Sequence, residues 1–243
     1  MSTIRRRPLY VVVLAAVLWA ADARAQSSPW SVSFDLGAQV PVSGDVHGAG
    51  SGQVLGLPTQ VESRSYDDVY GSGFGWAAGV GYRLGGTGEF RIQGSYTSNP
   101  AERLQVGSVA GLPLFALFDD YKAFGMDFGY RQYFGSGKAR PFVGASGGFV
   151  RIEEVRSEFS VPDAGVVLSE VGFYGSSIVP SFGAGGGMQI SLSDMVALQG
   201  GIEFKWQGDA EDNDGLAGTG LESINDESRR WSLPVTGGIT FRF

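Results

Sequence analysis

The only histidine of the chain is the first residue to consider for catalysis. His47 lies in the glycine-rich stretch 44–48, close to Asp45 and to several serines. A histidine that moves protons in catalysis needs a partner held within hydrogen-bond distance, as in a Ser-His-Asp triad. A flexible glycine-rich loop does not hold such a partner. We therefore interpret His47 as an ordinary loop histidine and expect that the chain is not an enzyme.

An acidic stretch at 209–215, which reads DAEDNDG, is the second candidate, because clustered carboxylates bind calcium. If Gly215 is aligned with the invariant glycine of an EF-hand loop, the first and last ligand positions fall on Ala210 and Leu221. The pattern fails, so we interpret the stretch as a solvated acidic loop, with weak divalent-cation binding as the alternative. The glycines at 183–187 are not followed by the Lys-Ser/Thr of a phosphate-binding loop. No metal site and no cofactor is expected.

The composition narrows the class of protein. Glycine accounts for 39 of 243 residues, 43% of the residues are hydrophobic and only 18% are charged. A chain rich in glycine and aromatics but poor in helix formers favours β structure, and it is too apolar to be disordered. The absence of cysteine excludes a disulfide framework and a thiol nucleophile.

The first 25 residues have the pattern of a secretory signal peptide. A basic segment at 5–7 precedes an apolar run at 9–21 and then Ala23-Arg24-Ala25, an A-x-A cleavage pattern. The run is short for a membrane anchor, which needs about 20 apolar residues. We expect cleavage near Ala25. The mature chain would keep 14 basic and 24 acidic residues, a net charge of −10, which argues against binding of nucleic acid.

Apolar and polar residues alternate with a period of two along most of the remaining chain, which is the signature of β-strands. In the first stretch, for example, Trp30, Val32 and Phe34 alternate with Ser31 and Ser33. The eight stretches of this kind are 30–40, 74–84, 89–97, 124–131, 143–149, 178–190, 196–206 and 231–243. No later run approaches the length of a membrane-spanning helix.

Connections between these stretches alternate in length. The short ones are 85–88, 135–138 and 192–194, and the long ones are 41–73, 98–120, 153–177 and 207–230. Short turns at one end and long loops at the other are typical of an up-and-down transmembrane barrel. The sequence therefore predicts an all-β fold, an eight-stranded antiparallel up-and-down transmembrane β-barrel formed by residues 26–243, with both chain ends on the short-turn, periplasmic side.

The main alternative is a water-soluble barrel of the lipocalin type, in which the apolar residues would face inward. The outward set would then contain many glycines and few Lys or Glu, which makes a poor soluble surface. Aromatic residues at the strand ends instead indicate a girdle at the membrane interface. The predicted interface aromatics are Trp30, Tyr82, Tyr130, Trp206 and Trp231, with Phe134 and Phe243 in similar positions.

Several charged residues fall on the inward side of the alternation. They are Arg83, Glu89, Arg91, Asp127, Arg131, Glu203 and Lys205. The interior of an eight-stranded barrel is narrow enough for side chains to fill it, and buried charges are tolerated only when they are paired. We therefore predict a lumen charge network in which the three arginines pair with the three carboxylates and the barrel is plugged.

The second long loop contains an apolar stretch at 112–118, which reads LPLFALF. Two interpretations are open. The stretch can form a hydrophobic mouth for a ligand, or it can pack against the rim of the barrel.

The last stretch, 231–243, ends in alternating apolar residues with Ile239, Phe241 and a final Phe243. This ending resembles the terminal signal of bacterial outer-membrane barrels, which the barrel-assembly machinery reads. Together with the segment 140–145 and the glycine-rich sixth stretch, this ending makes the mature chain similar to the small OmpA-type outer-membrane β-barrel domain family. The OmpW-like barrels are the alternative relatives.

The resemblance implies a location in the bacterial outer membrane of a Gram-negative cell. It also implies lipid and lipopolysaccharide as surroundings, and the barrel-assembly machinery and periplasmic chaperones as partners during biogenesis. The expected function is a non-enzymatic integral protein that anchors surface loops for an envelope or surface-contact role. The alternative is a narrow channel for small or hydrophobic solutes, as in OmpW-like relatives. A third, disfavoured alternative is a lipid-modifying enzyme that would use His47.

Overall fold

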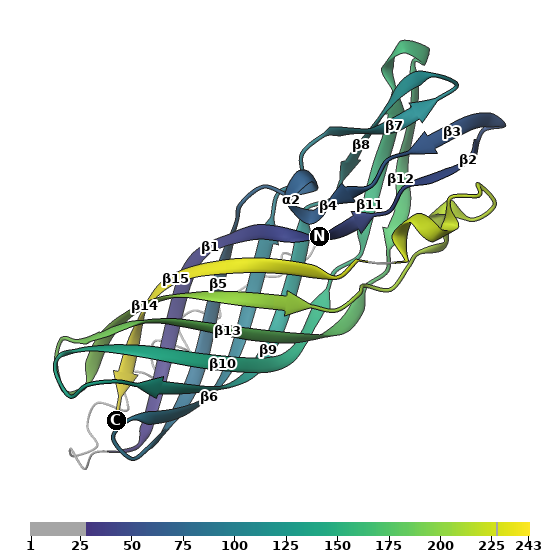
Figure 1. Cartoon of the computed structure of the whole chain (residues 1–243). Coiled ribbons are helices and arrows are strands. Elements are labelled where there is room, and N and C mark those ends of the chain that lie inside the picture. The colour runs from purple at the N-terminus through teal and green to yellow at the C-terminus, as the bar shows by residue number, and fades with distance from the viewer. Residues whose placement is uncertain (1–27, 227) are drawn as a thin grey trace, which may run out of the picture.

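Eight long antiparallel strands close into a barrel in the computed structural model, which describes residues 28–226 and 228–243 (Figure 1). The barrel strands are β1 (Trp30–His47), β5 (Gly73–Leu84), β6 (Gly88–Asn99), β9 (Tyr121–Tyr133), β10 (Ala139–Ile152), β13 (Ser177–Ser191), β14 (Val196–Gln207) and β15 (Arg230–Arg242). The predicted all-β, eight-stranded barrel is confirmed. The predicted signal peptide at 1–25 lies outside the described residues.

Closure of the barrel is made by the first and last strands. Strand β15 pairs with β1 from Ser31 opposite Arg242 to Gly44 opposite Arg230. Every other neighbour along the barrel is also antiparallel. A closed barrel pairs its backbone groups without leaving an edge, which is the condition for a β structure to cross lipid.

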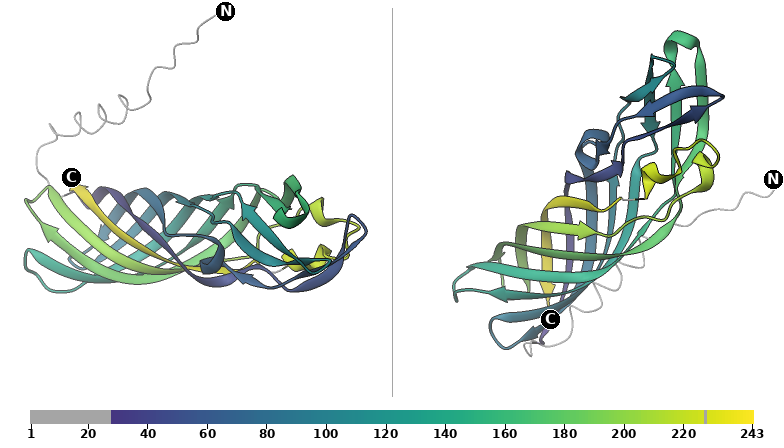
Figure 2. Two further views of the ribbon diagram at one scale, coloured as in Figure 1. Left: turned by 90° about the horizontal axis from the view of Figure 1, so that it is seen from above. Right: turned by 45° about the vertical axis from the view of Figure 1, so that its right-hand side comes forward.

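The barrel has two different ends. The connections β5–β6, β9–β10 and β13–β14 are short and lie at the end that also holds the C-terminus (Figure 2). We call this end the turn end and the opposite end the loop end. The length alternation that the sequence predicted is therefore present.

The alternation of side chains also has the predicted phase. On β1, Trp30, Phe34 and Leu36 are exposed, whereas Ser31 and Asp35 are buried inside the barrel. On the other strands the exposed large residues again come from the predicted outward set, and they are Phe74, Val80, Phe90, Ile92, Phe124, Met126, Phe128, Val143, Phe149, Phe182, Leu198, Ile202, Phe204 and Val235. The barrel thus has an apolar outer face and a polar interior.

The long connections are not flexible loops. Six strands of the first three connections form a second sheet in the order β12-β11-β8-β7-β3-β2, which we call the loop sheet. Its strands are β2 (Gly50–Val54), β3 (Leu57–Val61), β7 (Leu104–Val109), β8 (Leu112–Phe118), β11 (Val155–Val161) and β12 (Val166–Tyr174). The loop sheet projects from the loop end and lengthens the molecule along the barrel (Figure 2).

Smaller elements fill the junction between barrel and loop sheet. The two-residue strand β4 (Arg64–Ser65) pairs with the end of β1, and it leads into the one-turn helix α2 (Tyr66–Val69). The 3₁₀ turn η2 (Pro162–Ala164) joins β11 to β12. The fourth connection contains the 3₁₀ turns η3 (Asp214–Leu216) and η4 (Glu222–Asn225).

The apolar core of the described chain lies at the loop end. Val69, Val106, Ala116, Ile152 and Phe173 are fully buried there and belong to one hydrophobic cluster. Burial of apolar surface is the main stabilising term for a structure in water. The cluster therefore joins the ends of barrel strands to the loop sheet in one apolar core.

Within the described part of the chain, no helix is long and apolar enough to cross a membrane.

Candidate functional site

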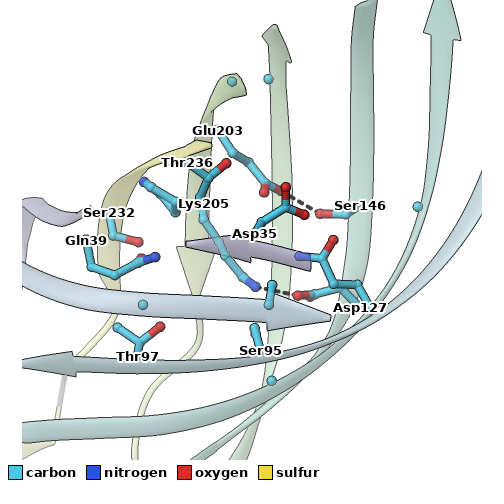
Figure 3. Close-up of a pocket in the computed structure, with 18 of the residues that line it drawn as sticks. Asp35, Gln39, Ser95, Thr97, Asp127, Ser146, Glu203, Lys205, Ser232 and Thr236 are labelled. Carbon is cyan, nitrogen blue, oxygen red and sulfur yellow. Dashed lines mark hydrogen bonds and ion pairs between the residues drawn. The ribbon is translucent and has the colours of Figure 1, made fainter. Parts of the chain in front are cut away.

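The centre of the lumen is held by one buried ion pair. The Lys205 Nζ atom on β14 lies 2.6 Å from the Asp127 Oδ2 atom on β9, and both side chains are nearly buried (Figure 3). The Ser181 hydroxyl donates to the other Asp127 oxygen at 3.0 Å. Strands β9 and β14 are separated by β10 and β13, so this pair spans the lumen.

A second ion pair lies closer to the turn end. The Arg91 Nη2 atom is 3.5 Å from the Asp35 Oδ2 atom and donates to the Ser33 hydroxyl at 2.6 Å. The Gln199 amide donates to the other Asp35 oxygen. Asp35 is absent from the predicted charge network, although its place between the outward residues Phe34 and Leu36 is the signal that would have found it.

The remaining predicted charges use neutral partners. The Glu203 carboxylate accepts from Ser146 at 2.6 Å, as Figure 3 shows. Arg131 donates to Gln199 at 3.1 Å, and its guanidinium lies 4.5 Å from the centre of the Phe142 ring.

Glu89 is likewise bound by hydroxyl groups. The Ser31 hydroxyl and the Tyr133 hydroxyl each donate to it at 2.6 Å. The predicted pairing of arginines with Glu89, Asp127 and Glu203 is therefore wrong: among the described residues, none of these carboxylates lies within 4.0 Å of Arg83, Arg91 or Arg131. Hydroxyl groups bind Glu89 and Glu203, and Asp127 is bound by the Lys205 ammonium and the Ser181 hydroxyl.

An aromatic cluster closes the lumen at the loop end. Helix α2 places the buried Tyr66 over the barrel, where its hydroxyl donates to Asn99 at 3.2 Å. Tyr121 donates to Gln207 at 2.7 Å. The buried Arg230 guanidinium lies 4.4 Å from the centre of the Tyr121 ring and 5.2 Å from that of Tyr66, which is cation–π distance.

A polar cavity of about 140 Å³ lies inside the barrel between these layers. Tyr66 and Tyr121 line its outer part, and Arg131, Phe142 and Gln199 line its inner part. Several water molecules fit into such a volume and would find polar partners there. The lumen thus has room for water and is crossed by side-chain contacts at several levels.

A second cavity, of about 160 Å³, lies beside the loop sheet, and its lining is almost entirely apolar. The lining includes Leu55, Leu112, Leu114, Val166, Leu168 and Ile224. The apolar stretch at 112–118 forms β8 of the loop sheet, with Leu112 and Leu114 on this cavity and Phe118 in the hydrophobic core. Exposed side chains such as Leu55 line part of this cavity, so it is open to the surface.

His47 is not in a flexible loop, contrary to our expectation. It ends β1, is buried, and packs beside the contacting rings of Phe118 and Phe173, with ring-centre distances of 6.0 and 6.1 Å. Its Nδ1 atom is 3.2 Å from the Gly48 carbonyl oxygen. In the described structure neither Asp45 nor a serine shares a hydrogen bond with the ring, so the ring has no triad geometry.

Burial lowers the pKa of His47 from its usual value of 6.5, and the charge of Arg64 acts in the same direction. The unfolded chain therefore binds a proton at a higher pH than the folded chain does. The stability of the loop end should be constant above about pH 6.5 and should fall as the pH is lowered further. Amide hydrogen exchange of the β1 end, corrected for its intrinsic pH dependence, measures this change.

The variant His47→Phe is the control for that measurement, because it keeps an aromatic ring beside Phe118 and Phe173 and cannot titrate. It should keep the same protection from pH 7.5 to pH 5.5. An equal loss of protection in the native protein and the variant would assign the effect to another group.

The acidic stretch 209–215 does not assemble a metal site. Among the described residues, no group of three or more His, Cys, Asp or Glu side chains is placed to hold a metal ion. Asp209 accepts from the Ser228 amide at 2.9 Å. Partial burial and the nearby Asp226 raise the pKa of Asp212. Asp209 thus stabilises the conformation of the connection between β14 and β15.

The predicted interface aromatics fall at two levels of the outer face. Trp30 is opposite Tyr82 at the turn end, and Trp206 is opposite Trp231 at the loop end. Tyr130 is paired with Phe90 at the level of the turn end. The predicted assembly residues Ile239 and Phe241 lie on β15 opposite Phe34 and Val32, and the Phe243 amide donates to the Trp30 carbonyl at 3.2 Å.

Comparison with known proteins identifies likenesses of fold only. No protein-family model matches the chain, and no curated protein sequence matches it. Among solved structures, Neisserial surface protein A is 16% identical with a TM-score of 0.46, over 89% of this chain and 98% of that one. The outer membrane protein OprG from Pseudomonas aeruginosa is 9% identical with a TM-score of 0.48, and the match covers 91% of this chain and 99% of that one.

A third solved structure is Ail, the attachment invasion locus protein of Yersinia pestis. It is 13% identical with a TM-score of 0.34, over 88% of this chain and 98% of that one. At this level of likeness the neighbours carry no argument about function, which must come from the chain's own geometry.

Proposed function

We propose that this protein is a non-enzymatic integral barrel of the bacterial outer membrane that holds the loop sheet at the cell surface for contact with a partner. The observation that carries the proposal is the loop sheet itself. A barrel that served only as a membrane anchor would need no hydrophobic core in its loops. This chain instead forms a six-stranded sheet from its loops and a buried apolar cluster at the loop end of the barrel.

The outer face of the barrel supports the location. Its apolar strand positions and its two levels of aromatic residues match the lipid-facing band of outer-membrane barrels. Long loops of such barrels are extracellular and short turns are periplasmic. The loop sheet would then meet lipopolysaccharide and the outside medium, and Ile239, Phe241 and Phe243 would present the assembly signal in the periplasm.

The tips of the loop sheet support a contact role. Leu55 is 72% exposed at the β2–β3 turn, and Leu57 and Val167 are also exposed. Leu55 has a φ of 54°, a left-handed conformation that is rare for an apolar residue and favours Gly or Asn. An exposed leucine in this conformation costs stability, which supports a role for its side chain in binding.

The variant Leu55→Asn tests the contact role, because Asn accepts the left-handed backbone and removes the apolar tip. Cells that display the native protein should adhere to a cultured epithelial layer more than cells without it. Cells with the variant should lose several-fold of this gain. The control is Leu192→Ser, which removes an exposed leucine at the turn end.

A native protein that confers no adhesion, or a Leu55→Asn variant that adheres as well as the native one, would contradict the contact role. Surface display of each variant must be equal in the same experiment. Antibody staining of whole cells measures it.

The second candidate function is a narrow channel for small or hydrophobic solutes. The lumen cavity of about 140 Å³ and the apolar cavity of about 160 Å³ favour it. The contacts of Lys205 with Asp127 and of Tyr121 with Gln207 cross the lumen and oppose it. We expect the reconstituted protein to give no steady single-channel current in a planar bilayer, and a steady current would favour the channel.

A further inference from the structure

Three arginines from three strands gather on the lumen side at the turn end. They are Arg83 on β5, Arg140 on β10 and Arg242 on β15, and each is partly buried. The charges of Arg83 and Arg140 act on that of Arg242 through space. We call these three residues, together with Gln189 on β13, the arginine cluster.

The cluster lacks a carboxylate partner. Among the described residues, no carboxylate lies within 4.0 Å of a guanidinium nitrogen of Arg83, Arg140 or Arg242. Glu89 is the acidic residue that acts on Arg242, and its two oxygens accept from Ser31 and Tyr133. The turn end of the lumen therefore holds three positive charges that no carboxylate of the described residues pairs.

Several donors of the cluster are also unused. The buried atoms Arg83 Nε, Arg83 Nη2, Arg140 Nε, Arg242 Nε and Gln189 Nε2 have no hydrogen-bond partner among the described residues. Gln189 is only 1% exposed. Buried donors of this kind normally have a partner, so five unused donors beside three charges require an explanation.

Three side chains of the cluster, those of Arg242, Gln189 and Arg140, are held in place by other contacts. Arg242 donates to Ser191 at 3.1 Å and to the Gln189 side-chain oxygen. The Arg140 guanidinium lies 4.6 Å from the centre of the Tyr133 ring, and Arg140 is the register partner of Gln189. These contacts leave the Nε atoms of both arginines free and fix their positions.

We infer that the arginine cluster is a binding site for an oxyanion of the phosphate type at the turn end of the barrel. Guanidinium groups bind phosphate oxygens through paired, charge-assisted hydrogen bonds. A tetrahedral oxyanion offers several acceptors at once, and it supplies the negative charge that the three arginines lack. The inference goes beyond the surface-contact role, because it concerns the opposite end of the molecule.

Two sources supply this chemistry. One is inorganic phosphate in solution. The other is the phosphate of a phospholipid headgroup, because the cluster lies at the mouth of the barrel near the turn-end aromatics such as Trp30. The experiment separates the two sources.

The test uses the full barrel in a maltoside detergent and a phosphate-free buffer. Inorganic phosphate should raise the urea unfolding midpoint, and sodium chloride of equal ionic strength should not, since binding to the folded state alone stabilises it. The variants Arg140→Gln and Arg242→Gln should each bind phosphate at least about tenfold more weakly. The control Arg151→Gln changes an exposed arginine at the other end of β10 and should respond like the native protein.

A second readout separates binding from a merely structural role. Without any oxyanion, Arg140→Gln removes an unpaired charge, so its unfolding midpoint should equal or exceed that of the native protein. A variant that is less stable without phosphate and responds to phosphate as the native protein does would overturn the inference.

The lipid arm repeats the measurement with phosphatidylglycerol in place of inorganic phosphate, and with an uncharged glycolipid as its control. A response to phosphatidylglycerol alone assigns the site to a headgroup, and a response to inorganic phosphate assigns it to a free ion. No response of the native protein to either one, or equal responses in the native protein and in both cluster variants, would overturn the inference.

Discussion

Replacement of Asp127 by alanine is expected to lower the free energy of unfolding by about 3 kcal/mol, at the lower end of the range for breaking a buried ion pair. The change leaves Lys205 charged inside the barrel without the carboxylate that now lies 2.6 Å away. Water in the adjacent cavity solvates part of this charge, which is the reason for the lower end. Urea unfolding in lipid vesicles, followed by tryptophan fluorescence, measures the loss.

Two further variants make this expectation specific. Lys205→Met combined with Asp127→Ala should restore most of the lost stability, because no unpaired charge remains. Glu154→Ala breaks a solvent-exposed pair with Arg156 and should cost much less stability than Asp127→Ala does. Equal losses for Asp127→Ala and Glu154→Ala would show that the lumen pair is hydrated like a surface pair.

The same Asp127→Ala variant also bears on transport. The Tyr121–Gln207 contact and the Arg91–Asp35 pair remain on either side of the missing carboxylate. We therefore expect no steady ion current in a planar bilayer. A variant of unchanged stability that conducts steadily would make the lumen a gated channel.

Replacement of Ile202 by arginine on the outer face of β14 is expected to destabilise the barrel by about 2–4 kcal/mol in a bilayer. Ile202 is 51% exposed, and it lies between the turn-end residue Leu198 and the loop-end residue Trp206 on the same strand. An arginine there would face the hydrocarbon. The free energy of unfolding in phospholipid vesicles measures the effect.

The matched control is Leu117→Arg, which changes a residue that is similarly exposed on β8 of the loop sheet. Because water surrounds the loop sheet in our proposal, this change should stay within about 0.5 kcal/mol, as for ordinary surface substitutions. A mild effect at Ile202 would mean that the apolar outer face does not contact lipid.

The barrel could be predicted from sequence because its signal is local. Each outward residue has an inward neighbour, as in Trp30, Ser31, Val32 and Ser33, and the period of two survives along the whole strand. The turns that join the strands are short and rich in glycine. Strand number, phase and closure follow from these features without knowledge of any long-range contact.

The loop sheet could not be predicted in this way. Its strands are short. Four of its pairings contain register shifts or extend over only a few residues, as between β11 and β12 or between β3 and β7. The burial of His47 depends on Phe118 and Phe173, which come from the second and third long connections. No local pattern around His47 reports contacts of that kind.

The arrangement of the lumen charges could be predicted from sequence only in part. Their inward direction follows from the alternation, but their partners depend on the tilt and stagger of the strands. Asp35 on β1 meets Arg91, which lies two strands away on β6. A list of inward charges that lacked Asp35 therefore gave incorrect pairs.

The continuity between barrel and loop sheet has a mechanical consequence. Strand β10 ends at Ile152, and β11 begins at Val155, so the chain passes from one sheet to the other with almost no slack. A force that pulls the loop sheet away from the membrane is directed along the barrel strands, and the hydrogen bonds of an antiparallel pair run across that direction. Many inter-strand hydrogen bonds are then loaded in shear and must break at the same time. The molecule is thus suited to bear tension at the junction without unravelling strand by strand.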